Sequence, residues 1–135
     1  MNISIRLYNE SLDYEMLSSW WEGHGQAAPR KDMLPEDTTY VLEVNGKPLL
    51  SACLYLMNCK AASLVENVIS NPLIFLPNRK QLVSALFSHI ENVAKSKGYN
   101  TLVIFSYEDK VKNRYEELGF TKTLNNVTTF SKEVI

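Results

Sequence analysis

The sequence lacks the features that mark several large classes of protein. Its longest apolar run is far shorter than the roughly 18–20 residues of a membrane-spanning helix, and its first residues lack the basic and then apolar order of a secretion signal. The 14 lysines and arginines nearly balance the 15 aspartates and glutamates, so the net charge is −1. No overall positive field would therefore attract nucleic acid or an anionic membrane, and we expect a cytoplasmic protein without a membrane partner.

Motifs for metal and nucleophilic chemistry are also missing. The two cysteines, Cys53 and Cys59, and the two histidines, His24 and His89, have no metal-ligand spacing and form no Cys-X-X-Cys. No Gly-X-Ser-X-Gly, no Walker loop and no nuclease-like group of carboxylates is present. We therefore expect no metal, and we expect buried free thiols in a reducing compartment, although the sequence leaves a disulfide open.

The length and composition are those of one ordinary domain. A chain of 135 residues can bury a core without disulfides, and 45% hydrophobic with 21% charged residues is typical of a globular protein. We find no internal repeat, low-complexity segment or linker, and therefore expect a single domain over residues 1–135.

One stretch organises the rest of the prediction. Residues 62–70 have the pattern of an apolar strand, and a polar loop and a long amphipathic helix ending at Gly98 follow. Residues 101–106 have the pattern of a second apolar strand. A strand, a helix and a strand in this order form a crossover with parallel strands. Ligands of such sheets bind beyond the carboxyl ends of the strands, which here means the region from Ser70 to Val83.

The other patterns predict the remaining elements. Residues 3–7 alternate between apolar and polar, and Ser11 is typical of a helix N-cap. Asn45-Gly46 is the usual sequence of a two-residue hairpin turn. The expected order of elements is β-α-β-β-β-α-β-α-β. The helix that starts at 11 has Leu12, Met16, Leu17, Trp20 and Trp21 on one face. The elements are strand 3–7, this helix, loop 26–37, strands 38–44, 48–57 and 62–70, the long helix, strand 101–106, helix 109–118 ended by Gly119, and one or two β segments in 120–135.

This order of elements resembles the GNAT N-acetyltransferase superfamily over nearly the whole chain. The most specific local match is Tyr115-Glu116-Glu117-Leu118-Gly119-Phe120, which is similar to the Y-E-K-L-G-F ending common in that family. Ser84-Ala85-Leu86 also resembles the family's long helix. The resemblance implies an α/β (α+β) domain with a mixed central sheet, in which a parallel strand pair splays apart and acetyl-CoA is the co-substrate.

The sequence departs from the family at the cofactor loop. GNAT enzymes usually carry R/Q-x-x-G-x-G/A before the long helix, because glycine lets backbone N–H groups approach the pyrophosphate. Here Gln81 and Val83 stand at the glycine positions, whereas Arg79 and Lys80 can pair with phosphate. The resemblance implies cofactor binding by Val68, Ile69, Ser70, Asn78, Arg79, Lys80, Gln81, Leu82 and Val83, with Asn113 as a weaker candidate because the family's usual asparagine position falls on Glu108.

Two residues are candidates for acid–base catalysis. Glu66 is either a carboxylate on the solvated face of its strand or a general base whose pKa burial would raise. Tyr115 either packs under the final strand or, as the resemblance implies, protonates the leaving thiolate of CoA. A phenol suits that task because its ordinary pKa of about 10 is close to that of a thiol.

The resemblance implies that the acceptor site lies around the first helix and the loop that follows it. Trp20 and Trp21 are adjacent, so they point to different faces of a helix, and one of them could be exposed beside His24. Such an aromatic would form a wall for the acceptor, although core packing and a structural histidine are the simpler interpretations. Tyr55 is a further candidate for this wall, or a core residue.

Three functions fit these observations. The leading hypothesis is an acyltransferase that moves acetyl from acetyl-CoA to a small-molecule or protein amine. The missing glycines also allow a catalytically degenerate, GNAT-shaped binding or inhibitory protein. The third is a phage Mom-like enzyme of nucleobase modification in the host cytoplasm, because the Trp-Trp, Gly-His-Gly and Leu34-Pro35 sequences are similar to those of small phage-encoded members. The near-neutral charge argues against unaided duplex binding, and an exposed final strand could pair two copies as a homodimer.

Overall fold

The computed structural model describes residues 1–76, 78–106, 114–124 and 127–134. The chain divides into two compact units, Met1–Phe105 and Ser106–Ile135, and each is described by itself. The first unit contains the elements β1 (Ile3–Leu7), α1 (Glu10–Gly23), η1 (Lys31–Met33), β2 (Thr39–Val44), β3 (Lys47–Leu56), β4 (Ser63–Ser70), α2 (Arg79–Ser96) and β5 (Leu102–Ile104).

The five strands form one mixed sheet in the order β1-β2-β3-β4-β5. The first four strands are antiparallel to their neighbours, and β5 joins β4 in parallel. The hairpin between β2 and β3 turns at Asn45 and Gly46, whose φ angles of 51° and 80° are those of a type I′ turn. The mixed sheet and the parallel pair follow the predicted fold class.

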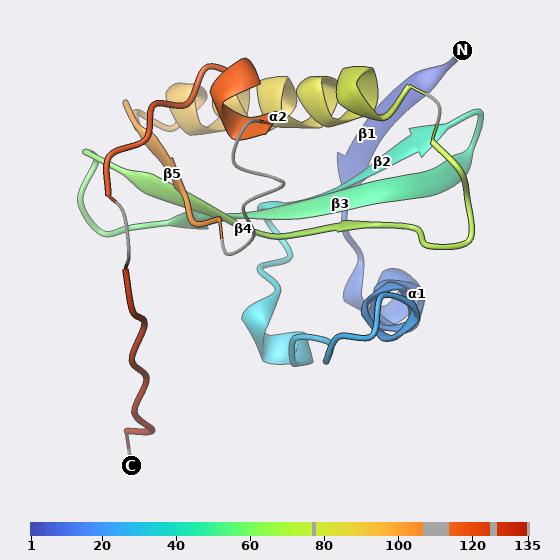
Figure 1. Cartoon of the computed structure of the whole chain (residues 1–135), viewed down its shortest axis with the longest axis horizontal. Coiled ribbons are helices and arrows are strands. Elements are labelled where there is room, and N and C mark those ends of the chain that lie inside the picture. The colour runs from blue at the N-terminus through green and yellow to red at the C-terminus, as the bar shows by residue number, and fades with distance from the viewer. Residues whose placement is uncertain (77, 107–113, 125–126, 135) are drawn as a thin grey trace. The chain divides into compact units, whose positions relative to one another are not determined.

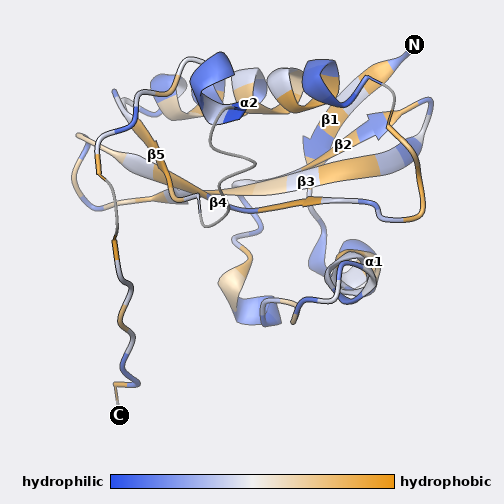
Figure 2. Cartoon of the chain, viewed as in Figure 1, coloured by the Kyte–Doolittle hydropathy of each residue, from blue (hydrophilic) through white to orange (hydrophobic). Residues whose placement is uncertain are grey.

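The two helices lie on opposite faces of this sheet (Figure 1). The helix α2 packs over β1, β2 and β3 through an apolar stripe at three- and four-residue spacing, and α1 packs against β4 on the other face. Figure 2 shows hydrophobic residues along the strands and on the side of α2 that faces them. The buried residues of α2 are Leu82, Leu86, Phe87, Ile90 and Ala94.

A second core cluster lies on the face of the sheet that α1 covers. It joins α1 to the strands and to the loop that carries η1. Its buried members are Tyr8, Leu17, Trp20, Trp21, Leu34, Val41, Cys53 and Ile69. Because aromatic side chains bury large areas, this cluster contributes much of the packing that fixes α1 on the sheet.

The predicted start of α1 is wrong by two residues. Asn9, and not Ser11, is the N-cap: its side-chain oxygen accepts a hydrogen bond from the Leu12 N–H at 3.2 Å, while the Ser11 hydroxyl donates to the same oxygen. The buried stripe of α1 runs through Asp13, Leu17, Trp20 and Trp21, so Leu12 lies beside this stripe and is exposed. The predicted ends of both helices are confirmed, and Gly98 follows α2 with a φ of 89°.

Asp13 is buried because it forms an ion pair that joins α1 to β1. Its carboxylate accepts hydrogen bonds from Arg6 Nη1 at 2.8 Å and Arg6 Nη2 at 2.9 Å, and the Asn9 N–H donates to the same group. Burial alone would raise the pKa of Asp13, but these hydrogen bonds and the Arg6 charge lower it below its ordinary value.

The second unit begins with a short helical segment among its described residues. Residues 114–117 are helical, and Gly119 follows with a φ of 96°, as the sequence predicted. The rest of the predicted helix 109–118 lies outside the described residues. The predicted final β segments do not appear in residues 120–124 or 127–134, which have no regular secondary structure. Residues 127–130 favour a strand by composition, but a strand also requires a ladder of hydrogen bonds with a neighbour.

Candidate active site

The parallel strands β4 and β5 stay paired over only a short stretch. Among the described residues, the paired rows are Ser63–Leu102, Leu64–Val103 and Val65–Ile104. The strand β4 continues beyond the last of these rows to Ser70. The five residues from Glu66 to Ser70 therefore run on toward α2 past the end of β5, which is the arrangement expected where a parallel pair separates.

A β-bulge in β4 begins at the same point. The rows Ser51–Ile69 and Cys53–Glu66 show that β3 advances two residues where β4 advances three. Asn67 has a φ of 55°, a left-handed conformation that asparagine tolerates better than most residues. A bulge bends the strand and changes the direction of its side chains. The bend therefore follows directly after Glu66.

Glu66 is half-buried in β4, directly opposite Cys53 of β3. Residues that face each other in an antiparallel pair project to the same side of the sheet, and Cys53 belongs to the cluster under α1. Burial raises the pKa of the Glu66 carboxyl. A carboxylate with a raised pKa is a better proton acceptor near neutral pH, so this environment suits the predicted general base.

Polar side chains surround this point on the same face. The Asn67 amide donates a hydrogen bond to the Tyr55 hydroxyl at 2.6 Å, and that hydroxyl donates to the Met33 carbonyl at 2.6 Å. The Cys53 thiol accepts a hydrogen bond from Thr39 at 3.2 Å. Burial has the largest effect on the pKa of Tyr55 and raises it, and the nearby Cys53 and Glu66 raise it further. The phenol therefore remains protonated and can donate a hydrogen bond.

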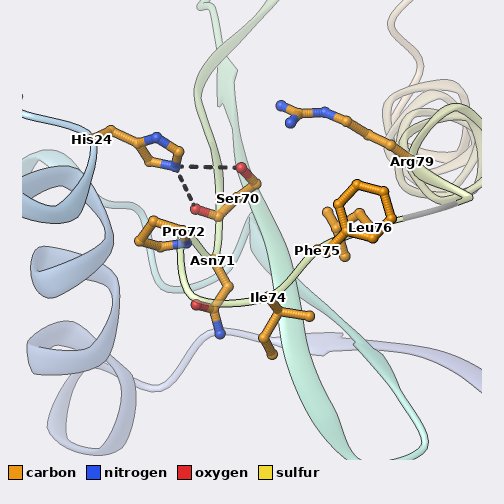
Figure 3. Close-up of a pocket in the computed structure, with 8 residues that line it drawn as sticks. All are labelled: His24, Ser70, Asn71, Pro72, Ile74, Phe75, Leu76 and Arg79. Carbon is orange, nitrogen blue, oxygen red and sulfur yellow. Dashed lines mark hydrogen bonds between the residues drawn. The ribbon is translucent and has the colours of Figure 1, made fainter.

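A cavity of about 240 Å³ lies at the carboxyl end of β4 (Figure 3). The end of α1, the end of β4, the loop after it and the first residue of α2 form its walls. The Arg79 guanidinium extends from α2 toward Ser70, and the ring of His24 faces Ser70 from the other side. The full lining is His24, Ser70, Asn71, Pro72, Ile74, Phe75, Leu76 and Arg79.

Two contacts hold the end of α1 against this cavity. His24 Nε2 lies 2.9 Å from the Ser70 carbonyl oxygen. A carbonyl can only accept, so Nε2 carries the hydrogen and donates it. Gly23 packs directly on Pro72: a Cβ on Gly23 would lie only 2.5 Å from Pro72 Cγ. Glycine is therefore required at this position by close approach.

The first turn of α2 is compatible with a phosphate group despite the missing glycines. Arg79 lines the cavity, Gln81 is exposed, and neither Gln81 nor Val83 belongs to the cavity lining. Asn78 precedes the helix, and its side chain makes no cap hydrogen bond with the first turn. Arg79, the first residue of α2, therefore brings a basic side chain to the end of the cavity at which the helix begins.

Other predicted cofactor residues have different surroundings. Leu82 is 2% exposed and its side chain packs in the core, and its predicted contact with the cofactor stays a prediction. Ile69 belongs to the cluster under α1, whereas Val68 is half-buried and Lys80 is exposed. Ser70 lines the cavity as predicted. Asn113 lies outside the described residues.

The predicted exposed tryptophan is not found. Trp20 and Trp21 are 3% and 7% exposed, and both belong to the core cluster. The loop residue Leu34 is buried in the same cluster and adds to its apolar surface. His24 is exposed beside the cavity, and Tyr55 is half-buried with a fully hydrogen-bonded hydroxyl.

Tyr115 lies in the helical segment of the second unit. It is half-buried, and its ring meets that of Phe120 edge-on, with 6.1 Å between the ring centroids. The packing interpretation placed Tyr115 under a final strand, which the described residues do not contain, so this contact does not test it. The catalytic role of Tyr115 also stays a prediction.

The cysteines are both free, as predicted, but only one is buried. Cys53 is buried in the sheet, whereas Cys59 is exposed in the turn after β3. Within the described part of the chain, no group of three or more histidine, cysteine, aspartate or glutamate side chains could hold a metal ion. No helix there is long and apolar enough to cross a membrane.

Sequence reasoning missed Asn67 and the loop residues of the cavity. The signal for Asn67 was an amide inside an otherwise apolar strand, a position that asparagine rarely occupies without a bulge. Pro72 and Phe75 had no such signal, because a loop sequence does not reveal which way its side chains point.

Comparison with solved structures identifies chains of the same architecture. An acetyltransferase of Trypanosoma brucei matches with a TM-score of 0.72 and 21% identity over 96% of this chain and 100% of the other. A glucosamine-6-phosphate N-acetyltransferase from Arabidopsis thaliana matches with a TM-score of 0.66 and 18% identity over 98% and 100%. A predicted acetyltransferase from Clostridium acetobutylicum, solved with acetyl-CoA, matches with a TM-score of 0.69 and 12% identity over 96% of both chains.

No protein-family model matches the sequence, and no curated protein matches it. The likeness is therefore one of three-dimensional arrangement, and it extends across nearly the full length of each chain. The chain has the fold of the GNAT N-acetyltransferase superfamily, as its sequence pattern predicted.

Proposed function

We propose that this protein transfers an acetyl group from acetyl-CoA to an amine. The observation that carries the proposal is the position of Glu66. It is the first residue of β4 beyond the last paired row with β5, it is half-buried, and burial raises the pKa of its carboxyl. A proton acceptor at the point where a parallel strand pair separates suits an acyl transfer in the resulting slot.

The proposed roles of Glu66 and Arg79 follow from their surroundings, and that of Tyr115 follows from the family resemblance. Glu66 takes a proton from the amine as its nitrogen forms a bond to the carbonyl carbon of the thioester. The C–S bond then breaks, and Tyr115 supplies a proton to the departing thiolate. Arg79 and the N-terminus of α2 hold the diphosphate of the donor in the cavity at the end of β4.

The acceptor is proposed to approach from the face of the sheet that α1 covers. Glu66 projects to the same side as Cys53, and the segment from Arg30 to Leu34 lies over that side through its contact with Tyr55. A small molecule or a protein segment that carries a primary amine fits this description. The walls formed by α1 and by the following loop would select between acceptors.

The first experiment separates donor binding from catalysis. The melting temperature of the protein is measured with increasing acetyl-CoA, and release of free thiol is followed with a panel of primary amines. A ligand at 100 times its dissociation constant should stabilise the protein by about 2.7 kcal/mol. Absence of both stabilisation and thiol release would favour a catalytically degenerate scaffold instead.

Substitution of Glu66 then tests the assigned base. We expect Glu66→Gln to lower kcat by about 10²–10⁴-fold while leaving the acetyl-CoA melting shift intact. Glu91→Gln, which changes an exposed carboxylate on α2, is the matched control and should retain full activity. Full activity in Glu66→Gln would contradict the role of Glu66, and loss of activity in Tyr115→Phe would support that of Tyr115.

A further inference from the structure

Two hydrogen bonds connect the bulge residue Asn67, through Tyr55 of β3, to the loop that contains Met33. The Asn67 amide donates to the Tyr55 hydroxyl, and the Tyr55 hydroxyl donates to the Met33 carbonyl, each over 2.6 Å. Both polar functions of the phenol are therefore used, one as acceptor and one as donor. Such a chain of hydrogen bonds strengthens each member, because each donor polarises the next.

The loop at one end of this chain has few other attachments. In the segment from Pro29 to Leu34, the Tyr14 hydroxyl donates to the Pro29 carbonyl at 2.7 Å, the Lys31 ammonium lies over the Tyr14 ring at 5.3 Å from its centroid, and Leu34 is buried in the cluster under α1. Met33 itself is 50% exposed, and the short helix η1 contains no buried residue. The contact with Tyr55 is thus a specific restraint on a lightly held segment.

The other end of the chain lies beside the proposed base. Asn67 follows Glu66 directly, and its positive φ sets the direction in which β4 bends. In a regular strand, neighbouring side chains project to opposite faces. Here the bulge returns the Asn67 side chain to the face of Cys53 and Tyr55, so its amide can fix the local backbone.

We propose that Tyr55 and Asn67 are positioning residues that make the orientation of Glu66 depend on where the Pro29–Leu34 segment lies. An amine acceptor that displaces this segment would alter the Met33–Tyr55–Asn67 connection and thereby the placement of the base. The proposal rests on the proposed acetyl transfer, since it names the groups that adjust its base to the acceptor. It adds a coupling between acceptor loop and base that burial of Glu66 alone does not provide.

The test breaks the connection at each end without enlarging any side chain. Tyr55→Phe removes the shared hydroxyl, and Asn67→Gly removes the amide while keeping a residue suited to the left-handed backbone. We expect each variant to lower kcat about tenfold, with the KM for acetyl-CoA unchanged within twofold. The double variant should also lose about tenfold, because both substitutions interrupt the same connection.

Tyr99→Phe is the matched control. It removes another tyrosine hydroxyl that donates to a main-chain carbonyl, that of Met57, without touching the Pro29–Leu34 segment or Asn67, and kcat should stay within twofold of the unmodified protein. A hundredfold loss in the double variant would show two independent effects and overturn the coupling. An equal loss in Tyr99→Phe would also overturn it, because a general loss of stability would then explain the result.

Hydrogen exchange decides the coupling without any enzymatic activity. We expect Asn67→Gly to speed amide exchange at Met33 and Leu34 at least threefold, and Tyr55→Phe to do the same at Val68. Exchange changes confined to the neighbours of each substitution would overturn the proposal. If the unmodified protein transfers no acetyl group but the distant exchange changes occur, the proposed function fails while the connection between loop and bulge stands.

Discussion

The contact between Gly23 and Pro72 offers a sharp test of how α1 supports the cavity. A Cβ at position 23 would lie 2.5 Å from Pro72 Cγ and 3.3 Å from Pro72 Cβ. Carbon atoms pack best at about 3.5–4.0 Å, so Gly23→Ala would push Pro72 away by roughly 1 Å. Overpacking of this kind costs about 1–3 kcal/mol, and the better helix propensity of alanine offsets at most about 1 kcal/mol.

We expect Gly23→Ala to lower stability by about 1 kcal/mol, or roughly 3–6 °C in Tm for a chain of this size. The larger effect should fall on the donor, because Pro72 lines the cavity next to Ser70. We expect acetyl-CoA to bind about tenfold more weakly, which corresponds to about 1.4 kcal/mol. Thermal melts and titration calorimetry measure the two quantities separately.

Gly25→Ala is the matched control for this prediction. Gly25 has a φ of 74°, and no atom lies within 4 Å of the position of an added Cβ. Alanine there costs about 1–2 kcal/mol through backbone strain but leaves Pro72 in place. Equal weakening of acetyl-CoA binding in both variants, or none in Gly23→Ala, would refute the reasoning that Gly23 sets the position of the loop.

Further predictions concern the ion pair, the thiols and the core. Arg6 lowers the pKa of Asp13 in the folded state, so the ion pair stabilises the protein fully above about pH 4, and this stabilisation is lost as the pH falls below that value. Asp13→Asn should lower the free energy of unfolding by about 2–3 kcal/mol at pH 7. The free energy of unfolding in urea should then depend less on pH in the acid range. A loss that is equal at pH 2 and pH 7 would contradict this sign. A thiol reagent should modify exposed Cys59 in the native protein and buried Cys53 only after unfolding. Rapid reaction of both thiols in the native protein would contradict this prediction. Leu86→Ala should destabilise by about 2–5 kcal/mol in chemical denaturation, and a change below 1 kcal/mol would remove that fully buried residue from the core.

Most of the first unit could be predicted from the sequence because its signals are local. The spacing of apolar residues located α2, and Asn45-Gly46 located the hairpin, since each pattern follows directly from backbone geometry. The parallel pairing of β4 and β5 followed from the order of the elements. Glu66 could be selected because a carboxylate inside an apolar strand is unusual.

The remaining features depend on contacts between distant residues. Burial of both Trp20 and Trp21 required a broad apolar surface to which the distant residue Leu34 contributes. The bulge at Asn67 is a mismatch between two strands, so the asparagine in β4 indicates a bulge but not how the register shifts against β3. The position of Pro72 depends on its contact with Gly23, which is far away in the chain.

In the proposed transfer, the part of β4 beyond Val65 holds the extended arm of acetyl-CoA where β4 and β5 separate. Amide hydrogen exchange measured with and without saturating acetyl-CoA tests it most directly. We predict new protection at residues 67–70 and in the first turn of α2, with little change in β1 and β2. Protection confined to other elements, or no protection while the ligand demonstrably binds, would contradict this account.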